Sequence, residues 1–116
     1  MQSNSSEPVN VPTAITTYQA AHDRRDVATA LAQFTADACV VDDGRRYEGR
    51  SGVEAFLSTA ASEYTYTRTL LAAEEITPDR WHVANHLEGN FPGGQVDLSY
   101  EFHLTDGLIM QLTIAP

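Results

Sequence analysis

Residues 95–114 read QVDLSYEFHLTDGLIMQLTI. Apolar and polar side chains alternate along both halves of this stretch, which is typical of β-strands that bury one face. The dipeptide Asp106-Gly107 separates the two halves and favours a tight hairpin turn. The apolar sides of the two strands are predicted to consist of Val96, Leu98, Tyr100, Phe102 and Leu104, and of Leu108, Met110, Leu112 and Ile114. The stretch therefore predicts a pair of antiparallel strands against a hydrophobic core.

Two further strands are expected before this pair. Residues 64–76 are rich in Thr, Tyr and Leu, which suit a pleated surface. Residues 80–91 alternate, with one face formed by Trp81, Val83, Asn85 and Leu87 and the other by His82, Ala84, His86 and Glu88. Because only short turns separate successive strands, we expect antiparallel neighbours and a four-strand meander.

The beginning of the chain predicts two helices. Pro12 suits a first helical turn, and apolar residues then recur at helical spacing as far as Arg24. Asp26 is expected to cap a second helix, with Phe34 on the apolar face of that helix.

A strand pair and a third helix are predicted next. A strand over residues 38–42 and a short strand over 46–48 flank the turn signal Asp43-Gly44. Ser51 and Glu54 have the spacing of a capping box, which predicts the start of a helix. That helix is expected to bury Val53, Phe56, Leu57 and Ala60. Segregated helices and strands indicate an α+β fold.

Length and charge restrict the organisation and the partners. A chain of 116 residues fits one domain, expected over residues 11–116, after a disordered lead-in over residues 1–10. The formal net charge of −9 disfavours binding to nucleic acid and to anionic membranes. The start of the chain lacks the features of a signal peptide, so we expect a cytoplasmic protein.

Several chemical classes are also disfavoured. All seven basic residues are arginines, which excludes a lysine Schiff base. Cys39 is the single cysteine and lies in an apolar run, where a buried structural role is expected. His82 and His86 would stand about 13 Å apart on a strand, too far to share one metal ion. We therefore expect neither a metal nor a cofactor.

Several segments resemble the nuclear-transport-factor-2-like superfamily, in its SnoaL-like and ketosteroid-isomerase-like branch. The resemblance extends over residues 12–115. It is carried by the order of the elements and by the segments Ile15-Thr16-Thr17-Tyr18, Asp26-Val27-Ala28, residues 34–42, residues 47–56 and residues 86–94. It implies a cone-shaped α+β barrel, with three N-terminal helices packed on a curved antiparallel sheet and an acid-lined pocket between the helices and the sheet.

The resemblance also implies a catalytic set. Tyr18 and Asp42 are 24 residues apart, the separation at which ketosteroid isomerases hold an oxyanion donor and a general base. Tyr100 stands where those isomerases place a protonated aspartate, a departure that argues against steroid isomerisation in particular. A carboxylate can move a proton between two carbons while phenols hydrogen-bond the enolate oxygen. The alternatives are that the two tyrosines are core aromatics and that Asp42 belongs to the turn.

Other residues are assigned to the pocket walls or to the surface. His22 lies one helical turn after Tyr18, so it faces the pocket or ends the helix near solvent. The expected substrate-binding residues are His22, Phe34, Phe56, Trp81 and Phe102, although Trp81 also suits the core. Arg68 and Glu101 are candidates for a solvent-side or interface charge pair. Because Asp97 and Glu101 are expected to face outward, the inward Asp-Arg-Asp set of a limonene-epoxide-hydrolase-like mechanism is disfavoured.

Two functions remain at this stage. The first is a cofactor-free isomerase or cyclase that applies acid–base chemistry to a small apolar carbonyl compound. The second is a non-catalytic dimeric domain for ligand binding or association. In either case, we expect a homodimer through the outward face of the sheet, which carries Leu71, His82 and His86.

Overall fold

The computed structural model describes residues 11–116, apart from the side chains of residues 60–62. The lead-in expected over residues 1–10 lies outside the described residues. Within them, no helix combines the length and the hydrophobicity needed to cross a membrane. The elements follow the order expected from the sequence: α1 (Thr13–Asp23), α2 (Val27–Leu31), β1 (Phe34–Asp42), β2 (Arg45–Glu48), α3 (Gly49–Glu63), β3 (Tyr66–Thr77), β4 (Arg80–Gly89), β5 (Gln95–Thr105) and β6 (Leu108–Ala115).

The six strands form one curved sheet in the order β2-β1-β6-β5-β4-β3. The predicted meander from β3 to β6 is confirmed, and the Asp43-Gly44 hairpin joins β1 to β2. The sheet is not wholly antiparallel, because β1 runs parallel to β6. It also stays open, since β2 and β3 form its two free edges. The α+β cone is therefore confirmed, with a mixed and unclosed sheet.

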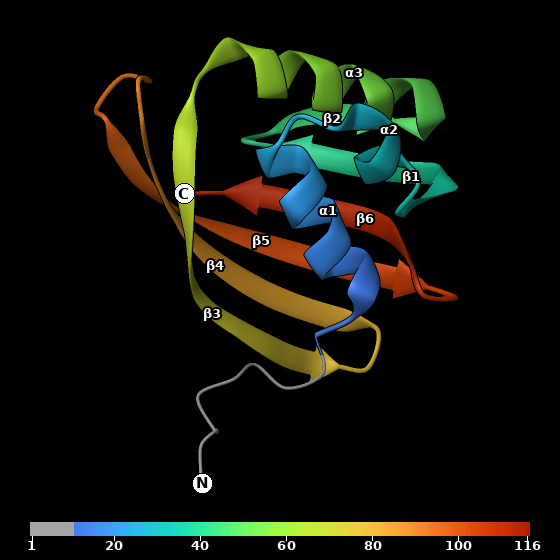
Figure 1. The fold of residues 1–116 in the computed structure, drawn as a ribbon. Helices are drawn as coiled ribbons and strands as arrows, with labels where there is room; N and C mark the ends of the chain where they lie inside the picture. The colour runs from blue at the N-terminus through green and yellow to red at the C-terminus, as the bar shows by residue number, and fades with distance from the viewer. Residues whose placement is uncertain (1–10) are drawn as a thin grey trace, which may run out of the picture.

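The three helices cover one face of the sheet (Figure 1). The core lies between them and the concave face, where Ile15, Phe56 and Phe102 are almost completely buried. Asp26 caps α2 as predicted, because its carboxylate accepts a hydrogen bond from the Thr29 backbone N–H at 3.1 Å. Only α1 and α3 are long enough to pack a substantial apolar stripe against the sheet.

Two boundary predictions are wrong. The third helix begins at Gly49 rather than at the predicted capping box, and its N-cap residue Glu48 makes no side-chain capping bond. Gly49 has a φ of 75°, a conformation in which glycine lets the chain turn directly from β2 into the helix. Phe34 begins β1 instead of ending the second helix, because it pairs with Ile109 of β6.

Two face assignments also change. In β6, Ile109 is fully buried, whereas Leu108 and Met110 are each 37% exposed. The pairing register shifts here, because Leu104 pairs with Ile109 whereas the preceding residue of β5 pairs with Gln111. Met110 is therefore an inserted residue, and the side chains before it lie on the opposite face from the one that strict alternation predicts. Cys39 is half-buried on the outward face rather than buried in the core, because its neighbours Ala38 and Val40 take the inward positions.

Candidate functional site

A cavity of about 110 Å³ lies between the helices and the concave face of the sheet. All three residues proposed from the sequence as catalytic line it, and so do His22 and Phe56. The complete lining consists of Tyr18, His22, Asp42, Phe56, Tyr66, Leu87, Leu98, Tyr100 and Ile114. The cavity thus gathers residues from two helices and five strands, and most of its wall is apolar or aromatic.

Strand pairing places Asp42 and Tyr100 on one row across the sheet. Asp42 pairs with Ile114 of β6, and Ile114 pairs in turn with Tyr100 of β5. Two strand spacings separate Asp42 from Tyr100, which is roughly 10 Å between their Cα atoms. All three side chains project from the concave face into the cavity. The parallel pairing of β1 with β6 is therefore the feature that brings the carboxylate opposite the phenol.

Tyr18 contributes the second phenol from α1. Its side chain is 1% exposed, and its ring contacts Phe34 and Phe102 edge-on, at centroid distances of 5.5 and 6.0 Å. Its hydroxyl has no hydrogen-bond partner among the described residues. Burial, followed by the nearby Tyr100 hydroxyl, raises the pKa of Tyr18 well above its ordinary value. Tyr18 is therefore a protonated donor at neutral pH, with its hydrogen bond free for a ligand.

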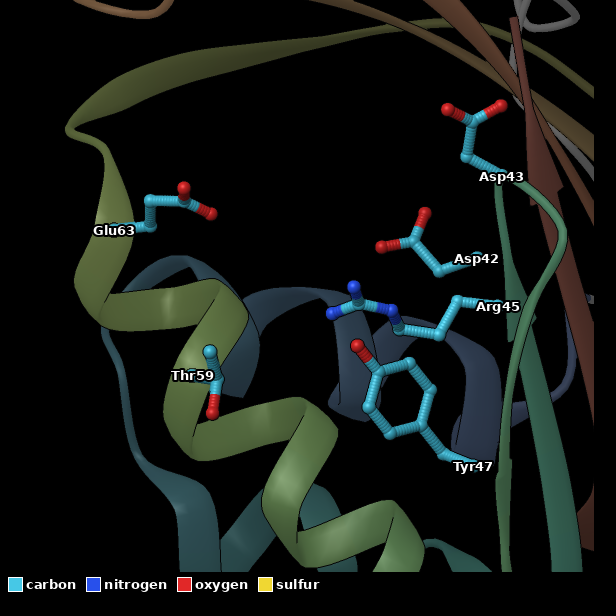
Figure 2. A pocket seen from close by; sticks show the side chains of 6 residues that line it. All are labelled: Asp42, Asp43, Arg45, Tyr47, Thr59 and Glu63. Atoms are coloured by element: carbon cyan, nitrogen blue, oxygen red, sulfur yellow. The ribbon is translucent and has the colours of Figure 1, made fainter.

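Asp42 stands at the boundary between this cavity and a second, more polar pocket. The outer pocket has a volume of about 280 Å³ and is lined by Asp42, Asp43, Arg45, Tyr47, Thr59 and Glu63. Figure 2 shows Asp42 and Arg45 projecting from the β1–β2 hairpin, with Thr59 and Glu63 on α3 across the gap. Burial raises the pKa of Asp42, the negative charge of Asp43 adds to this rise, and Arg45 opposes it.

This position suits a group that must exchange protons. Its inner side faces apolar walls, where a carboxylate is poorly solvated and therefore more basic. Its outer side faces a polar pocket through which protons can pass to and from solvent. Asp43 does not share the role, because it is exposed and adopts the left-handed turn conformation with a φ of 52°.

His22 belongs to the cavity wall rather than to a solvent-exposed helix end. Its imidazole is stacked between the rings of Tyr18 and Phe56, at centroid distances of 5.6 and 5.9 Å. Burial lowers the pKa of His22, and the neighbouring Asp23 only partly opposes that effect. His22 is therefore neutral at physiological pH and serves as a flat, weakly polar wall.

Three of the expected substrate-binding residues do not line the cavity. Phe34, Trp81 and Phe102 are 2%, 5% and 0% exposed and belong to the hydrophobic core. Phe34 and Phe102 support the cavity from behind by packing against Tyr18. Four lining residues were not singled out by the sequence reasoning: Tyr66, Leu87, Leu98 and Ile114. Strand alternation had placed three of them on apolar faces. However, alternation does not indicate which residues of such a face line a cavity and which are packed into the core.

Arg68 is also placed differently from the expected surface pair with Glu101. Its guanidinium Nε donates to both carboxylate oxygens of Asp23, at 3.0 and 2.9 Å, and its Nη2 lies 2.8 Å from Asp23 Oδ2. Its Nη1 donates to Asn85 Oδ1 at 3.2 Å and to Gln19 Oε1 at 3.4 Å. The residue thus points inward and joins α1 to β3 and β4.

On the outward face, His86 lies between two carboxylates. His86 Nδ1 lies 2.5 Å from Asp97 Oδ1, and its Nε2 lies 3.1 Å from Glu88 Oε2. These hydrogen bonds to Asp97 and Glu88 raise the pKa of His86. Across the described part of the chain, no three His, Cys, Asp or Glu side chains are grouped as metal ligands.

Comparisons with known proteins identify the fold. The sequence matches no family model and no curated protein. Among solved structures, a candidate polyketide cyclase from Sinorhizobium meliloti is 28% identical. It has a TM-score of 0.86, with 94% of this chain and 99% of that chain covered.

Two further structures are similar in fold and were solved with small molecules. A protein with a ketosteroid isomerase-like fold from Catenulispora acidiphila, in complex with trimethylamine, is 17% identical with a TM-score of 0.80, covering 92% of this chain and 87% of its own. A Mycobacterium tuberculosis protein in complex with estradiol-17beta-hemisuccinate is 20% identical with a TM-score of 0.75, covering 89% and 90%. Taken with the cavity, these similarities show that the chain has the α+β cone fold of ketosteroid isomerase-like and nuclear-transport-factor-2-like proteins.

Proposed function

We propose that this protein is an acid–base enzyme that isomerises or cyclises a small, largely apolar carbonyl compound without a cofactor. Asp42 takes a proton from the carbon next to the carbonyl group and returns it to another carbon. Tyr18 and Tyr100 donate hydrogen bonds to the oxygen on which negative charge develops. Charge stabilisation of this kind by a positioned donor is typically worth a factor of 10² to 10³ in rate.

One observation carries this proposal. A carboxylate whose pKa is raised by burial shares a cavity with two phenols, and the hydroxyl of Tyr18 has no partner in the described part of the chain. A buried donor without a partner costs stability, so its retention is typical of a site that a ligand completes. Both phenols have raised pKa values, to about 12 for Tyr100, so both keep their protons at pH 7.

The size of the cavity indicates the substrate class. A volume of about 110 Å³ is well below the 300–1,000 Å³ or so of a typical ligand pocket. It suits a single ring or a short branched chain better than fused rings. The polar outer pocket beyond Asp42 can take a hydrophilic substituent. We therefore propose a small cyclic ketone or a comparable carbonyl compound.

A second function, ligand binding without turnover, is favoured by one specific observation. Two structures with this fold were solved in complex with small molecules, estradiol-17beta-hemisuccinate and trimethylamine. A binding domain would use the same cavity but would not need a base. The two functions therefore differ in whether the Asp42 carboxylate is required for chemistry.

Deuterium exchange tests the proposal without knowledge of the natural substrate. A panel of small cyclic ketones is incubated with the protein in D₂O, and incorporation next to the carbonyl group is followed by NMR. Asp42→Asn keeps the shape of the side chain but cannot accept a proton from carbon. We expect it to slow the exchange catalysed by the wild type by about a hundredfold or more, the usual contribution of a general base.

Asp43→Asn is the matched control, because it makes the same chemical change one residue away. Asparagine tolerates the left-handed conformation of this turn position, so the hairpin should survive. Exchange should fall far less in this variant than in Asp42→Asn, because the base is retained and only the contribution of the Asp43 charge to its pKa is lost. Ligand binding without any exchange above background, in the wild type as in Asp42→Asn, would favour the non-catalytic function.

A further inference from the structure

A chain of polar side chains runs behind the wall of the cavity, from the end of α1 to Tyr100. Asp23 accepts hydrogen bonds from the Arg68 guanidinium, and Arg68 donates in turn to Asn85 Oδ1 at 3.2 Å. Asn85 is completely buried, and the Arg68 side chain is only 19% exposed. Burying such a network costs free energy unless every donor and acceptor is paired. It therefore matters which group donates each hydrogen bond and which group accepts it.

The chemistry of these side chains fixes which of them donates and which accepts each hydrogen bond. A guanidinium group can only donate hydrogen bonds, so the amide oxygen of Asn85 must face Arg68. Asp23 in turn holds Arg68 in place through both carboxylate oxygens. The amide nitrogen of Asn85 therefore points away from Arg68. It has no hydrogen-bond partner within the described part of the chain, although it is fully buried.

Tyr100 lies on the side to which this nitrogen points. Asn85 pairs with Leu98 across β4 and β5, and Tyr100 is the next inward residue of β5, a diagonal neighbour on the same face. Such neighbours are about 7–8 Å apart at Cα, within reach of an aromatic side chain. Burial, and then the nearby Tyr66 hydroxyl, raise the pKa of Tyr100 to about 12, whereas the neighbouring Asn85 side chain lowers it.

We propose that Asn85 is a positioning residue that orients the hydroxyl of Tyr100 for catalysis. Held by Arg68, the amide N–H of Asn85 is directed at the Tyr100 oxygen. A phenol oxygen that accepts a hydrogen bond on one side directs its own hydrogen to the other side, and here that side is the cavity. The bond tightens as negative charge builds up on a bound ligand, because a phenol that donates to an oxyanion becomes a better acceptor.

This inference rests on the proposed function, in which Tyr100 donates to the carbonyl oxygen. It also explains why the inward Arg68 and the buried amide of Asn85 lie behind the cavity although neither contacts the proposed substrate. It also predicts that the effect of Asn85 passes through Tyr100 alone. A residue that only supports the fold would not show this dependence.

A double-mutant cycle tests the dependence. The probe is para-nitrophenolate, whose oxygen mimics an enolate, with binding followed by its absorbance. All variants carry Asp42→Asn, which stands in for the protonated base and removes its repulsion of the probe. Asn85→Leu keeps the approximate shape but cannot donate. It should weaken binding about tenfold, because the Tyr100 hydroxyl is then no longer held in place to donate its hydrogen bond to the charged probe.

The same change in a Tyr100→Phe background should have almost no effect, because the group that Asn85 orients is then missing. Nitrobenzene, which has no oxyanion, should bind equally well to all four proteins. Equal losses in both backgrounds, or no loss in either, would overturn the inference. If Asn85→Leu fails to fold, Asn85→Asp replaces it in the NMR experiment below, since its carboxylate still accepts from Arg68 but can no longer donate; it is not used in the binding cycle, where its charge would repel the probe in both backgrounds.

NMR of protein labelled at the Cζ carbon of tyrosine separates this inference from the proposed function. The Tyr100 signal is assigned by its loss in Tyr100→Phe. Without any ligand, Asn85→Leu should shift that signal, because the shift reports on hydrogen bonding at the phenol oxygen. A shifted signal with no binding of para-nitrophenolate to the Asp42→Asn parent would support the inference and count against the proposed function. An unchanged signal would refute the inference alone.

Discussion

Tyr18→Phe removes a single buried oxygen atom and should make the protein more stable. The ring keeps its contacts, because Phe34, Phe102 and His22 touch its edge and face. The lost hydroxyl has no protein partner within the described residues, so no other group is left unpaired. A buried polar group without a partner costs about 1–3 kcal/mol. We expect the free energy of unfolding to rise by about 1 kcal/mol, toward the lower end of that range.

Urea unfolding measures this change directly. Trp81, the only tryptophan, is 5% exposed and provides an intrinsic fluorescence signal. In thermal unfolding, a gain of about 1 kcal/mol corresponds to about 4 °C in a domain of this size. The same variant should lose the oxyanion donor, so ketone exchange should fall by about a hundredfold. A gain in stability combined with a loss of activity is expected when a functional group is buried without a partner in the free protein.

Tyr47→Phe is the matched control for this prediction. Its hydroxyl is hydrogen-bonded to the Arg45 side chain, so removing it breaks an existing bond. This variant should lose a little stability rather than gain any, because the bond that it breaks is exposed to solvent. If Tyr18→Phe instead lost as much stability as Tyr47→Phe, the Tyr18 hydroxyl would be satisfied in the folded protein, and the argument that a ligand completes it would fail.

Two further predictions concern pH and assembly. Because burial raises the pKa of Asp42, ionisation of this group favours the unfolded chain. The contribution of Asp42 to wild-type stability should therefore fall as pH rises from about 3.8, the ordinary aspartate value, through the raised pKa of Asp42 in the folded state. Asp42→Asn should be more stable than the wild type at pH 7 and equally stable at pH 3; an unchanged difference between these pH values would contradict the assignment. We also propose a homodimer through the outward sheet face, near Leu71, which is 52% exposed. Light scattering should then give about twice the 12.7 kDa chain mass at tens of micromolar, and a mass of one chain would reject the dimer.

Local patterns were sufficient for the order of the elements. The alternation in residues 80–105 predicted which face of β4 and β5 is buried, because a period of two is the direct consequence of strand geometry. Asp43-Gly44 and Asp106-Gly107 predicted their hairpins, since both pairs adopt the positive φ that such turns require. The same alternation placed Asp42 on the side of Val40, and the structure has Asp42 at the cavity.

Features that depend on inserted residues could not be predicted in this way. Alternation favoured Leu108 and Met110 as the buried residues of β6, but a register shift gives that place to Ile109. A bulge moves every following side chain to the other face, and its position depends on the partner strand rather than on the sequence of the strand itself. The start of α3 was missed because the turn at Gly49 replaced the side-chain cap expected two residues later.

The sequence alone therefore determined the α+β class and the meander, because these follow from short-range periodicity and turn chemistry, while its resemblance to the ketosteroid-isomerase-like branch supplied the candidate acid and phenols. Only the tertiary structure decided what those groups face. The parallel pairing of β1 with β6 sets Asp42 in line with Tyr100. Arg68 resembled a surface charge in the sequence, but its partner Asp23 lies 45 residues away. Contacts over such separations depend on how whole strands and helices pack, and no local pattern encodes them.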